Sequence, residues 1–301
     1  MNLRFVEAYY WVVSLKSVSR AAEKLFITQS AMSSRISALE DELGVLLLDR
    51  RDKQFRLTVA GMRFFNHAQR LLALQREIKG EMGAGTGQQR AVTLRIGVIE
   101  SVLHSWLIEW VQHMRVGNPD FELELTVETT PVLVDQVRRG ALDLAFAALP
   151  TAGEGLRSRA LPSMEMVFVG HAQMHRKRRY TLEDLAAIDL LTFQRGSQPH
   201  VGLLDLFREA GLSMRRVHTI SSISAMVQLV EGGFGVATLP LAAVKRLAER
   251  FPLKPLTCEA ALPPLPVHAS YREDPTSMVA QGVVDAVLDY VGPAPRPRRR
   301  G

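Results

Sequence analysis

The sequence has only one cysteine, no apolar run long enough to span a bilayer, and no leader-like start. Cys258 is the single cysteine among 301 residues, which excludes an intrachain disulfide and agrees with a reducing compartment. No stretch approaches the ~18 apolar residues that a membrane-spanning helix needs. Residues 1–7 do not combine a charged segment with an apolar one and a small-residue cleavage site. We therefore expect a cytoplasmic protein without a membrane partner.

The motifs of common enzymes are also missing from the sequence. It contains no His-Glu-x-x-His, no Gly-x-x-x-x-Gly-Lys and no Gly-x-Ser-x-Gly. The glycine-rich residues 232–235 follow an expected helix, so a dinucleotide site is not expected there. His171 and His175 have helical spacing, but the adjacent basic run 176–179 would repel a metal cation. We expect no enzymatic activity, no catalytic residue, no metal and no cofactor.

Positive charge is concentrated at the two ends of the chain. Residues 1–90 contain 14 Lys and Arg against 9 Asp and Glu, whereas residues 91–290 contain 19 against 22. Four arginines and no acid lie in residues 291–301. A basic N-terminal segment suits contact with a phosphate backbone, although charge alone is also compatible with a solvated surface.

The first 44 residues predict three short helices, the last two joined by a tight turn. Apolar residues recur at helical spacing over 3–15, and Ser17 or Ser19 can cap a second helix that ends near residue 25. Thr28 can cap a third helix over residues 29–43, where Gly44 ends it. The small and polar start of this third helix is typical of a helix that reads the major groove. The expected DNA-contacting residues of this region are Ser19, Arg20, Thr28, Gln29, Ser30, Ser33, Ser34 and Arg35.

A basic hairpin and a long helix are expected next. Extended segments before residue 49 and after residue 54 would form a wing whose Arg50, Arg51 and Lys53 meet phosphates or the minor groove. A helix over 58–82 follows, and its apolar stripe suits either a dimer contact or burial against its own domain. The stripe consists of Phe64, Ala68, Leu71, Leu74, Ile78 and Met82.

Strands and helices alternate through the remainder, which predicts parallel sheets with covering helices. The tail 293–301 is rich in proline and arginine and is expected to be disordered. The expected strands are 93–98, 121–127, 142–146, 166–170, 190–193, 234–238 and 267–271. The expected helices are one that follows strand 93–98 and those over 132–139, 201–210, 224–231 and 276–290.

Four segments together resemble the LysR-type transcriptional regulators, and the resemblance extends over nearly the whole chain. They are 20–33 (RAAEKLFITQSAMS), 39–44 (LEDELG), 47–50 (LLDR) and 57–61 (LTVAG). The resemblance implies a winged helix-turn-helix, a dimerising linker helix, and a two-lobed α/β domain similar to type 2 periplasmic binding proteins. It also implies a homotetramer built from dimers that binds double-stranded promoter DNA and responds to a small effector.

The α/β fold is therefore expected to be divided into a DNA-binding domain, a linker, an effector-binding domain and a tail. These comprise residues 1–58, 59–90, 91–292 and 293–301. Within the effector-binding domain, lobe I is expected over about 91–162 and 268–292, and lobe II over about 163–267.

The resemblance implies that the effector lies between the two lobes. Hydroxyl groups and free N–H groups at helix starts suit a carboxylate or another anion, although the same hydroxyls could serve only as helix caps. The matching positions are Ser101, Thr129, Thr130, Gln194, Arg195, Ser197, Ser222 and Ile223.

Two functions fit these observations. The first is a sequence-specific transcriptional regulator controlled by a small polar or anionic effector. The alternative is a cytoplasmic solute-binding sensor without specific DNA reading, which leaves residues 1–60 unexplained. A DNA reader should lose affinity steeply with added salt and still prefer one promoter over random duplex.

Overall fold

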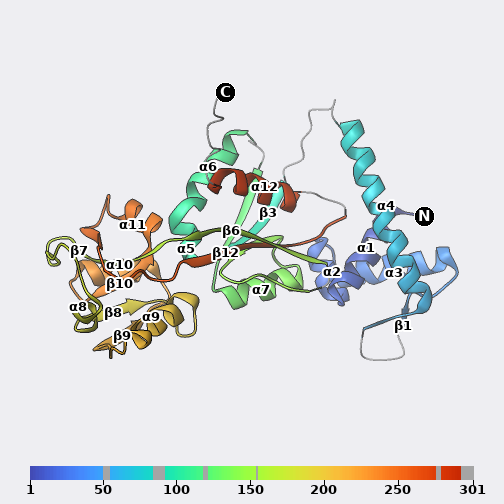
Figure 1. The fold of residues 1–301 in the computed structure, drawn as a ribbon. Helices are drawn as coiled ribbons and strands as arrows, with labels where there is room; N and C mark the ends of the chain where they lie inside the picture. The colour runs from blue at the N-terminus through green and yellow to red at the C-terminus, as the bar shows by residue number, and fades with distance from the viewer. Residues whose placement is uncertain (50–54, 84–91, 118–120, 154, 276–278, 293–301) are drawn as a thin grey trace, which may run out of the picture.

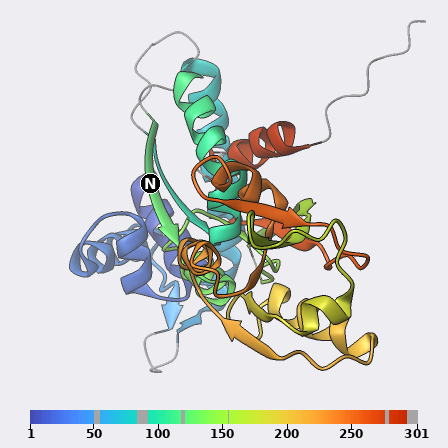
Figure 2. The ribbon, with the colours of Figure 1, turned by 90° about the vertical axis from the view of Figure 1, so that its left-hand side faces the viewer.

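The computed structural model describes residues 1–49, 55–83, 92–117, 121–153, 155–275 and 279–292. Figure 1 shows a helical unit with a small hairpin at one end, followed by two α/β units. We call these the HTH unit, lobe I and lobe II. Figure 2 views the molecule from the lobe II end, with the HTH unit to one side of it. Within the described ranges, none of the helices has the length and apolar character needed to cross a membrane.

The HTH unit has the helix ends that the sequence predicted. Of the two candidate serines, Ser17 caps α2 by accepting a hydrogen bond from Arg20 N, and Thr28 caps α3 by accepting one from Ala31 N. Gly44 ends α3 in the left-handed conformation, with φ 68°. The elements are α1 (Leu3–Leu15), α2 (Val18–Lys24), α3 (Gln29–Leu43), β1 (Leu48–Asp49), β2 (Arg56–Leu57) and α4 (Val59–Gly83).

The apolar stripe on α4 is divided between two environments. Ala68 is fully buried in the core of the HTH unit, where Phe64 packs at its edge. Leu74, Ile78 and Met82, further along the helix, are 53, 50 and 72% exposed. Burial against its own domain therefore accounts for the first half of the stripe and leaves the second half open to solvent.

Lobe I is a five-stranded sheet covered by helices, with strand order β4-β3-β5-β12-β6. Trp110 and Phe146 are among its largest fully buried side chains. The strands are β3 (Val92–Val98), β4 (Phe121–Val127), β5 (Leu144–Ala147), β6 (Leu156–Met164) and β12 (Leu265–Arg272). The helices are α5 (Glu100–Val102), a π-helical turn η1 (Leu103–Leu107), α6 (Ile108–Gly117), α7 (Thr130–Arg139) and α12 (Val279–Val291).

Lobe II is a second five-stranded sheet, with order β11-β7-β10-β8-β9. The chain enters this lobe after β6 and returns to lobe I through β12. The strands are β7 (Met166–His171), β8 (Asp189–Thr192), β9 (Arg216–Thr219), β10 (Val236–Pro240) and β11 (Leu253–Leu256). The helices are α8 (Leu182–Ala186), α9 (Gln198–Glu209), α10 (Ile223–Glu231) and α11 (Leu241–Leu247).

Both sheets are mixed, which corrects the expectation of parallel sheets. The pairs β3–β4, β3–β5, β8–β9 and β8–β10 are parallel, but β12 and β7 run antiparallel to their neighbours. The expected strands and helices all occur, with ends that differ by a few residues. The strands β6, β9 and β11 and the short helices α8 and α11 were not predicted from the sequence.

Candidate DNA-binding face and effector cleft

The polar residues at the start of α3 lie on the surface of the HTH unit. Thr28 serves as the cap of the helix, and its hydroxyl also lies 3.0 Å from that of Ser30. Buried Met32, Ile36 and Leu39 hold the opposite face of α3 in the core. Ser19, Arg20, Thr28, Gln29, Ser30, Ser33 and Ser34 are exposed, and Arg35 is half-buried. The three wing residues, Arg50, Arg51 and Lys53, lie outside the described residues.

Two buried polar contacts fix the hairpin and α4 relative to the other helices. Glu40 is only 4% exposed, and its Oε1 accepts hydrogen bonds from Leu47 N at 2.8 Å and Leu48 N at 3.1 Å. The buried Tyr9 hydroxyl donates to Gly61 O at 2.8 Å. Because buried amides need acceptors, these contacts couple the position of the wing to that of α3.

A cavity of about 540 Å³ lies between the two lobes. On the lobe I side it is bounded by the ends of β3, β4 and β5 and the start of α7. On the lobe II side it is bounded by the segment after β8 and the starts of α9 and α10. The carboxyl ends of parallel strands are where open α/β sheets bind ligands.

Seven of the eight effector residues expected from the sequence line this cavity. They are Ser101, Thr129, Thr130, Gln194, Arg195, Ser197 and Ser222. Ile223 does not line the cavity, because its side chain is fully buried in the core of lobe II.

The hydroxyls of the cavity differ in how they are used. Ser197 and Ser222 cap α9 and α10 by accepting from His200 N and Ala225 N, respectively, at 3.4 Å. Thr130 Oγ1 accepts from Ala148 N at 3.1 Å. Within the described part of the chain, the hydroxyls of Ser101 and Thr129 have no hydrogen-bond partner.

Two carboxylates that are not among the expected site residues also line the cavity. Glu100 follows β3 and accepts a hydrogen bond across the cleft from Ile223 N, whereas Glu128 follows β4 and accepts one from Thr129 N at 3.3 Å. Arg195 is the positively charged side chain in the lining. Glu128 directly follows the expected strand 121–127 and Glu100 lies two residues after the expected strand 93–98, so the sequence contained a signal for both positions.

The segment that carries Arg195 is shaped by a neutral histidine. Gly196, at φ 81°, donates its N–H to Nδ1 of the buried His200 at 3.3 Å. Burial, and to a smaller extent the charge of Arg195, lowers the pKa of His200. A neutral imidazole can accept this hydrogen bond, so the loop over the cleft is held without adding a second positive charge.

Two family models match the chain and together cover most of it. Residues 3–62 match the family described as "Bacterial regulatory helix-turn-helix protein, lysR family". Residues 87–292 match the "LysR substrate binding domain".

Curated proteins are similar to the chain over most of its length, and solved structures share its fold. The chain is 25% identical over 285 residues to the HTH-type transcriptional regulator BenM of Acinetobacter baylyi, covering 92% of each chain. It is 31% identical over 251 residues to a probable hydrogen peroxide-inducible genes activator of Mycobacterium avium, covering 81% of this chain and 79% of that one. A full-length cysteine-to-aspartate variant of OxyR from Pseudomonas aeruginosa has a similar fold, with TM-score 0.63 at 23% identity over 97% of this chain and 94% of that one.

Proposed function

Because this chain belongs to the LysR family of DNA-binding transcriptional regulators, we propose that α3 reads promoter DNA under the control of an effector bound between the lobes. The observation that carries the proposal is the exposed polar start of α3 on a helix whose other face is buried. Residues 1–58 form the DNA-binding domain, 59–90 the linker and 91–292 the effector-binding domain. The basic tail, residues 293–301, follows these three domains and belongs to none of them.

The residues of α3 divide into base readers and phosphate contacts. Gln29, Ser33 and Arg35 contact base edges, since Gln pairs with adenine and Arg with guanine bidentately. Serine hydroxyls and the basic wing residues Arg50, Arg51 and Lys53 contact phosphates or the adjacent minor groove. The other contacts come from Ser19, Arg20, Thr28, Ser30 and Ser34.

Binding of the full-length chain to a duplex selected in vitro tests this assignment. Gln29→Ala should weaken binding to the selected duplex by about 5–150-fold and leave binding to random duplex unchanged, since one bidentate base contact is worth about 1–3 kcal/mol. Asn66→Ala, at an exposed position of α4, serves as the control. Equal affinity of the unsubstituted chain for selected and random duplex would favour the alternative, a solute sensor without DNA reading.

The effector is a small polar molecule with groups of two kinds. An acidic or other acceptor group faces Arg195 and the unpartnered hydroxyls of Ser101 and Thr129. A hydrogen-bond donor faces the carboxylates of Glu100 and Glu128. Thr130, Gln194, Ser197 and Ser222 complete the polar lining, and the Ile223 N–H bond to Glu100 links the lining to α10.

Thermal-shift measurements with small acids, amines and amino acids test this chemistry on the full-length chain. For a compound that binds, Ser101→Ala and Thr129→Val should each weaken affinity by about 2–12-fold, because a neutral hydrogen bond contributes about 0.5–1.5 kcal/mol. Ser213→Ala, at an exposed position of lobe II, should leave affinity unchanged. Unchanged affinity in both cleft variants would remove these two residues from the site.

The same proposal covers assembly, location and chemistry. The exposed half of the α4 stripe, Leu74, Ile78 and Met82, forms a dimer contact, and two dimers form a homotetramer in the cytoplasm. The protein acts by binding and not by catalysis.

Since Cys258 is the only cysteine, the likeness to peroxide-inducible activators does not bring an intrachain disulfide switch. Burial also raises the pKa of its thiol, which makes it a poor nucleophile at neutral pH.

A further inference from the structure

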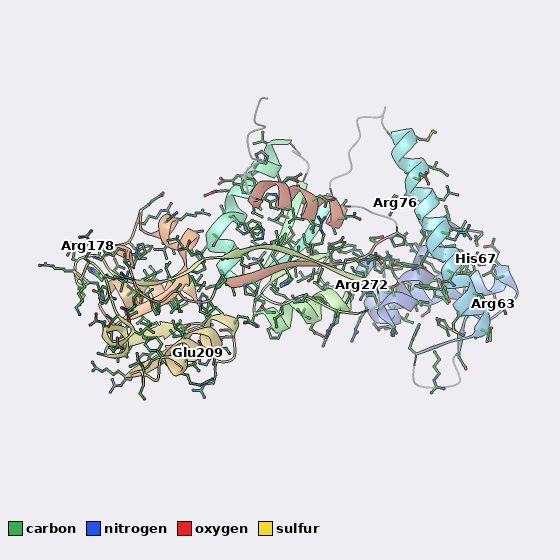
Figure 3. The ribbon with its side chains drawn as sticks, viewed as in Figure 1. Arg63, His67, Arg76, Arg178, Glu209 and Arg272 are labelled. Carbon is green, nitrogen blue, oxygen red and sulfur yellow. The ribbon has the colours of Figure 1, made fainter. Side chains whose placement is uncertain are left out.

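The HTH unit packs directly on lobe I through residues that serve neither the DNA face nor the effector cleft. We call this contact the seat. Figure 3 labels Arg272, which lies where the HTH unit meets lobe I. The seat consists of Tyr10, Ser14, Leu15 and Lys24 of the HTH unit and of Arg95, Gly140, Asp143 and Arg272 of lobe I.

An ion triad with little exposure forms the centre of the seat. Lys24 Nζ lies 2.5 Å from Asp143 Oδ1, and Arg95 Nη2 lies 2.9 Å from the same oxygen. The three side chains are only 16, 15 and 13% exposed. Burial favours a raised pKa for Asp143, but the hydrogen bond from Arg95 and the charge of Lys24 outweigh it and lower the pKa. The carboxylate is therefore charged, and it pairs with Lys24 of the HTH unit.

Arg272 joins one helix end from each side of the seat. This side chain is 8% exposed, and it donates from Nη1 to Ser14 O at 3.3 Å and from Nη2 to Arg138 O at 2.7 Å. Ser14 is in the last turn of α1, and Arg138 is in the last turn of α7. Carbonyls at helix C-termini lack partners within the helix and carry partial negative charge, so they suit a guanidinium.

The two surfaces also fit closely in shape. Gly140 has φ 74°, and a Cβ atom there would lie 3.0 Å from Cδ2 of Leu15. The Tyr10 hydroxyl donates to Glu273 O at 3.1 Å. A close fit of this kind means that a shift of lobe I at the seat must move the HTH unit or break the contact.

Three elements of lobe I connect the seat to the effector cleft: α7 and β5 each have one end in the seat, and β3 contributes its middle residue, Arg95. Helix α7 starts at Thr130, in the cleft, and ends beside Gly140, in the seat, over about 15 Å at the usual rise per residue. Strand β5 follows Asp143 directly and is followed by Ala148, which lines the cleft. Strand β3 contains Arg95 at its middle and leads into the cleft at its end.

We propose that the seat couples the effector cleft to the HTH unit within one chain, with the Lys24–Asp143 ion pair making the HTH unit follow α7, β3 and β5. This inference rests on the proposed DNA-binding and effector-binding function. Coupling between two sites is reciprocal in free energy, so DNA binding must change effector affinity by the same factor as the effector changes DNA affinity. We expect the response of the cleft to DNA to be visible in its amides without an effector.

Hydrogen exchange of the full-length chain, with and without its in vitro selected duplex, provides the measurement. We expect DNA to slow exchange of the amides in residues 129–140 by about fivefold or more, the lower end of usual coupling factors. Lys24→Met should keep binding to the selected duplex and lose this slowing, because its side chain faces lobe I and not the DNA. Asp143→Asn breaks the same pair from the lobe I side and should behave alike.

Lys177→Met supplies the matched control. Lys177 Nζ also lies 2.5 Å from an aspartate, Asp184, but this pair is in lobe II and its side chains are 59 and 26% exposed. The slowing should persist in this variant. Two results would overturn the coupling alone. One is slowing that persists in Lys24→Met or Asp143→Asn while DNA is bound. The other is the absence of slowing in the unsubstituted chain when DNA is bound. Failure of the unsubstituted chain to prefer the selected duplex would count against the DNA-reading function, and against the coupling with it.

Discussion

Replacing Glu40 with alanine should loosen the HTH unit selectively. Its carboxylate is the acceptor for the N–H groups of Leu47 and Leu48, and alanine leaves both amides buried without it. A buried unsatisfied amide costs about 1–3 kcal/mol, so two cost about 2–6 kcal/mol. Because the substitution also relieves the burial of a carboxylate, we expect a net loss in the lower half of this range, about 3 kcal/mol.

Hydrogen exchange measured by mass spectrometry can resolve this loss within the full-length chain. A loss of about 3 kcal/mol in the free energy of opening should speed exchange of the α3 amides by about 100-fold, since a tenfold change corresponds to about 1.4 kcal/mol. Affinity for DNA should fall as well, because the wing and α3 lose their fixed relation. Asp41→Ala, at the exposed neighbouring position, should change exchange little. If Glu40→Ala exchanges no faster than Asp41→Ala, the carboxylate does not hold α3 and the hairpin together.

Three further substitutions probe the HTH unit, lobe I and the seat. Gly61→Ala should abolish DNA binding, because its Cβ would lie 2.1 Å from the backbone oxygen of Leu47. The Cβ of Gly282→Ala would have no atom within 4 Å, so this substitution should raise stability by about 0.5–1 kcal/mol. Circular dichroism melting curves and DNA binding of the two variants distinguish these outcomes, and equal behaviour would contradict the reasoning. The pKa of the Asp143 carboxyl is lower in the folded chain than in the unfolded chain, where it is about 3.9. The contribution of this carboxylate to stability is therefore complete well above about pH 3.9 and is lost as the pH falls through the lower pKa of the folded state. The melting temperature of the unsubstituted chain minus that of Asp143→Asn should therefore shrink below about pH 4, and a difference that stays constant down to pH 2 would refute this.

The ends of the HTH helices could be predicted because the signals that set them are local. Ser17, Thr28 and Gly44 each act on backbone groups within about one helical turn, so their residue types and spacing suffice. The cleft hydroxyls were expected on other grounds, because the resemblance to the LysR family implies an effector between the two lobes. The expected helix over 201–210 begins three residues later than α9, so the spacing did not show that Ser197 is the cap of that helix.

The mixed character of the sheets could not be predicted from the local pattern. Strand β6 contains Arg157 and Arg159, and most of its side chains are exposed, so it lacks the apolar run of a buried strand. It pairs along its length with β12, more than 100 residues further along the chain. Pairing over such a separation depends on the tertiary fold, and periodicity over a short window does not contain that information.

The ion pair of Lys24 could not be predicted from the local pattern either. A lysine at the end of a short helix predicts a solvated charge beside the helix C-terminus. Its partner, Asp143, lies 119 positions further on, and only the packing of the HTH unit on lobe I brings them together. The seat uses α1 and α2, while Gln29 and Ser33 on α3 stay exposed. Contact with lobe I therefore leaves the proposed DNA face of the HTH unit open, as the proposed coupling requires.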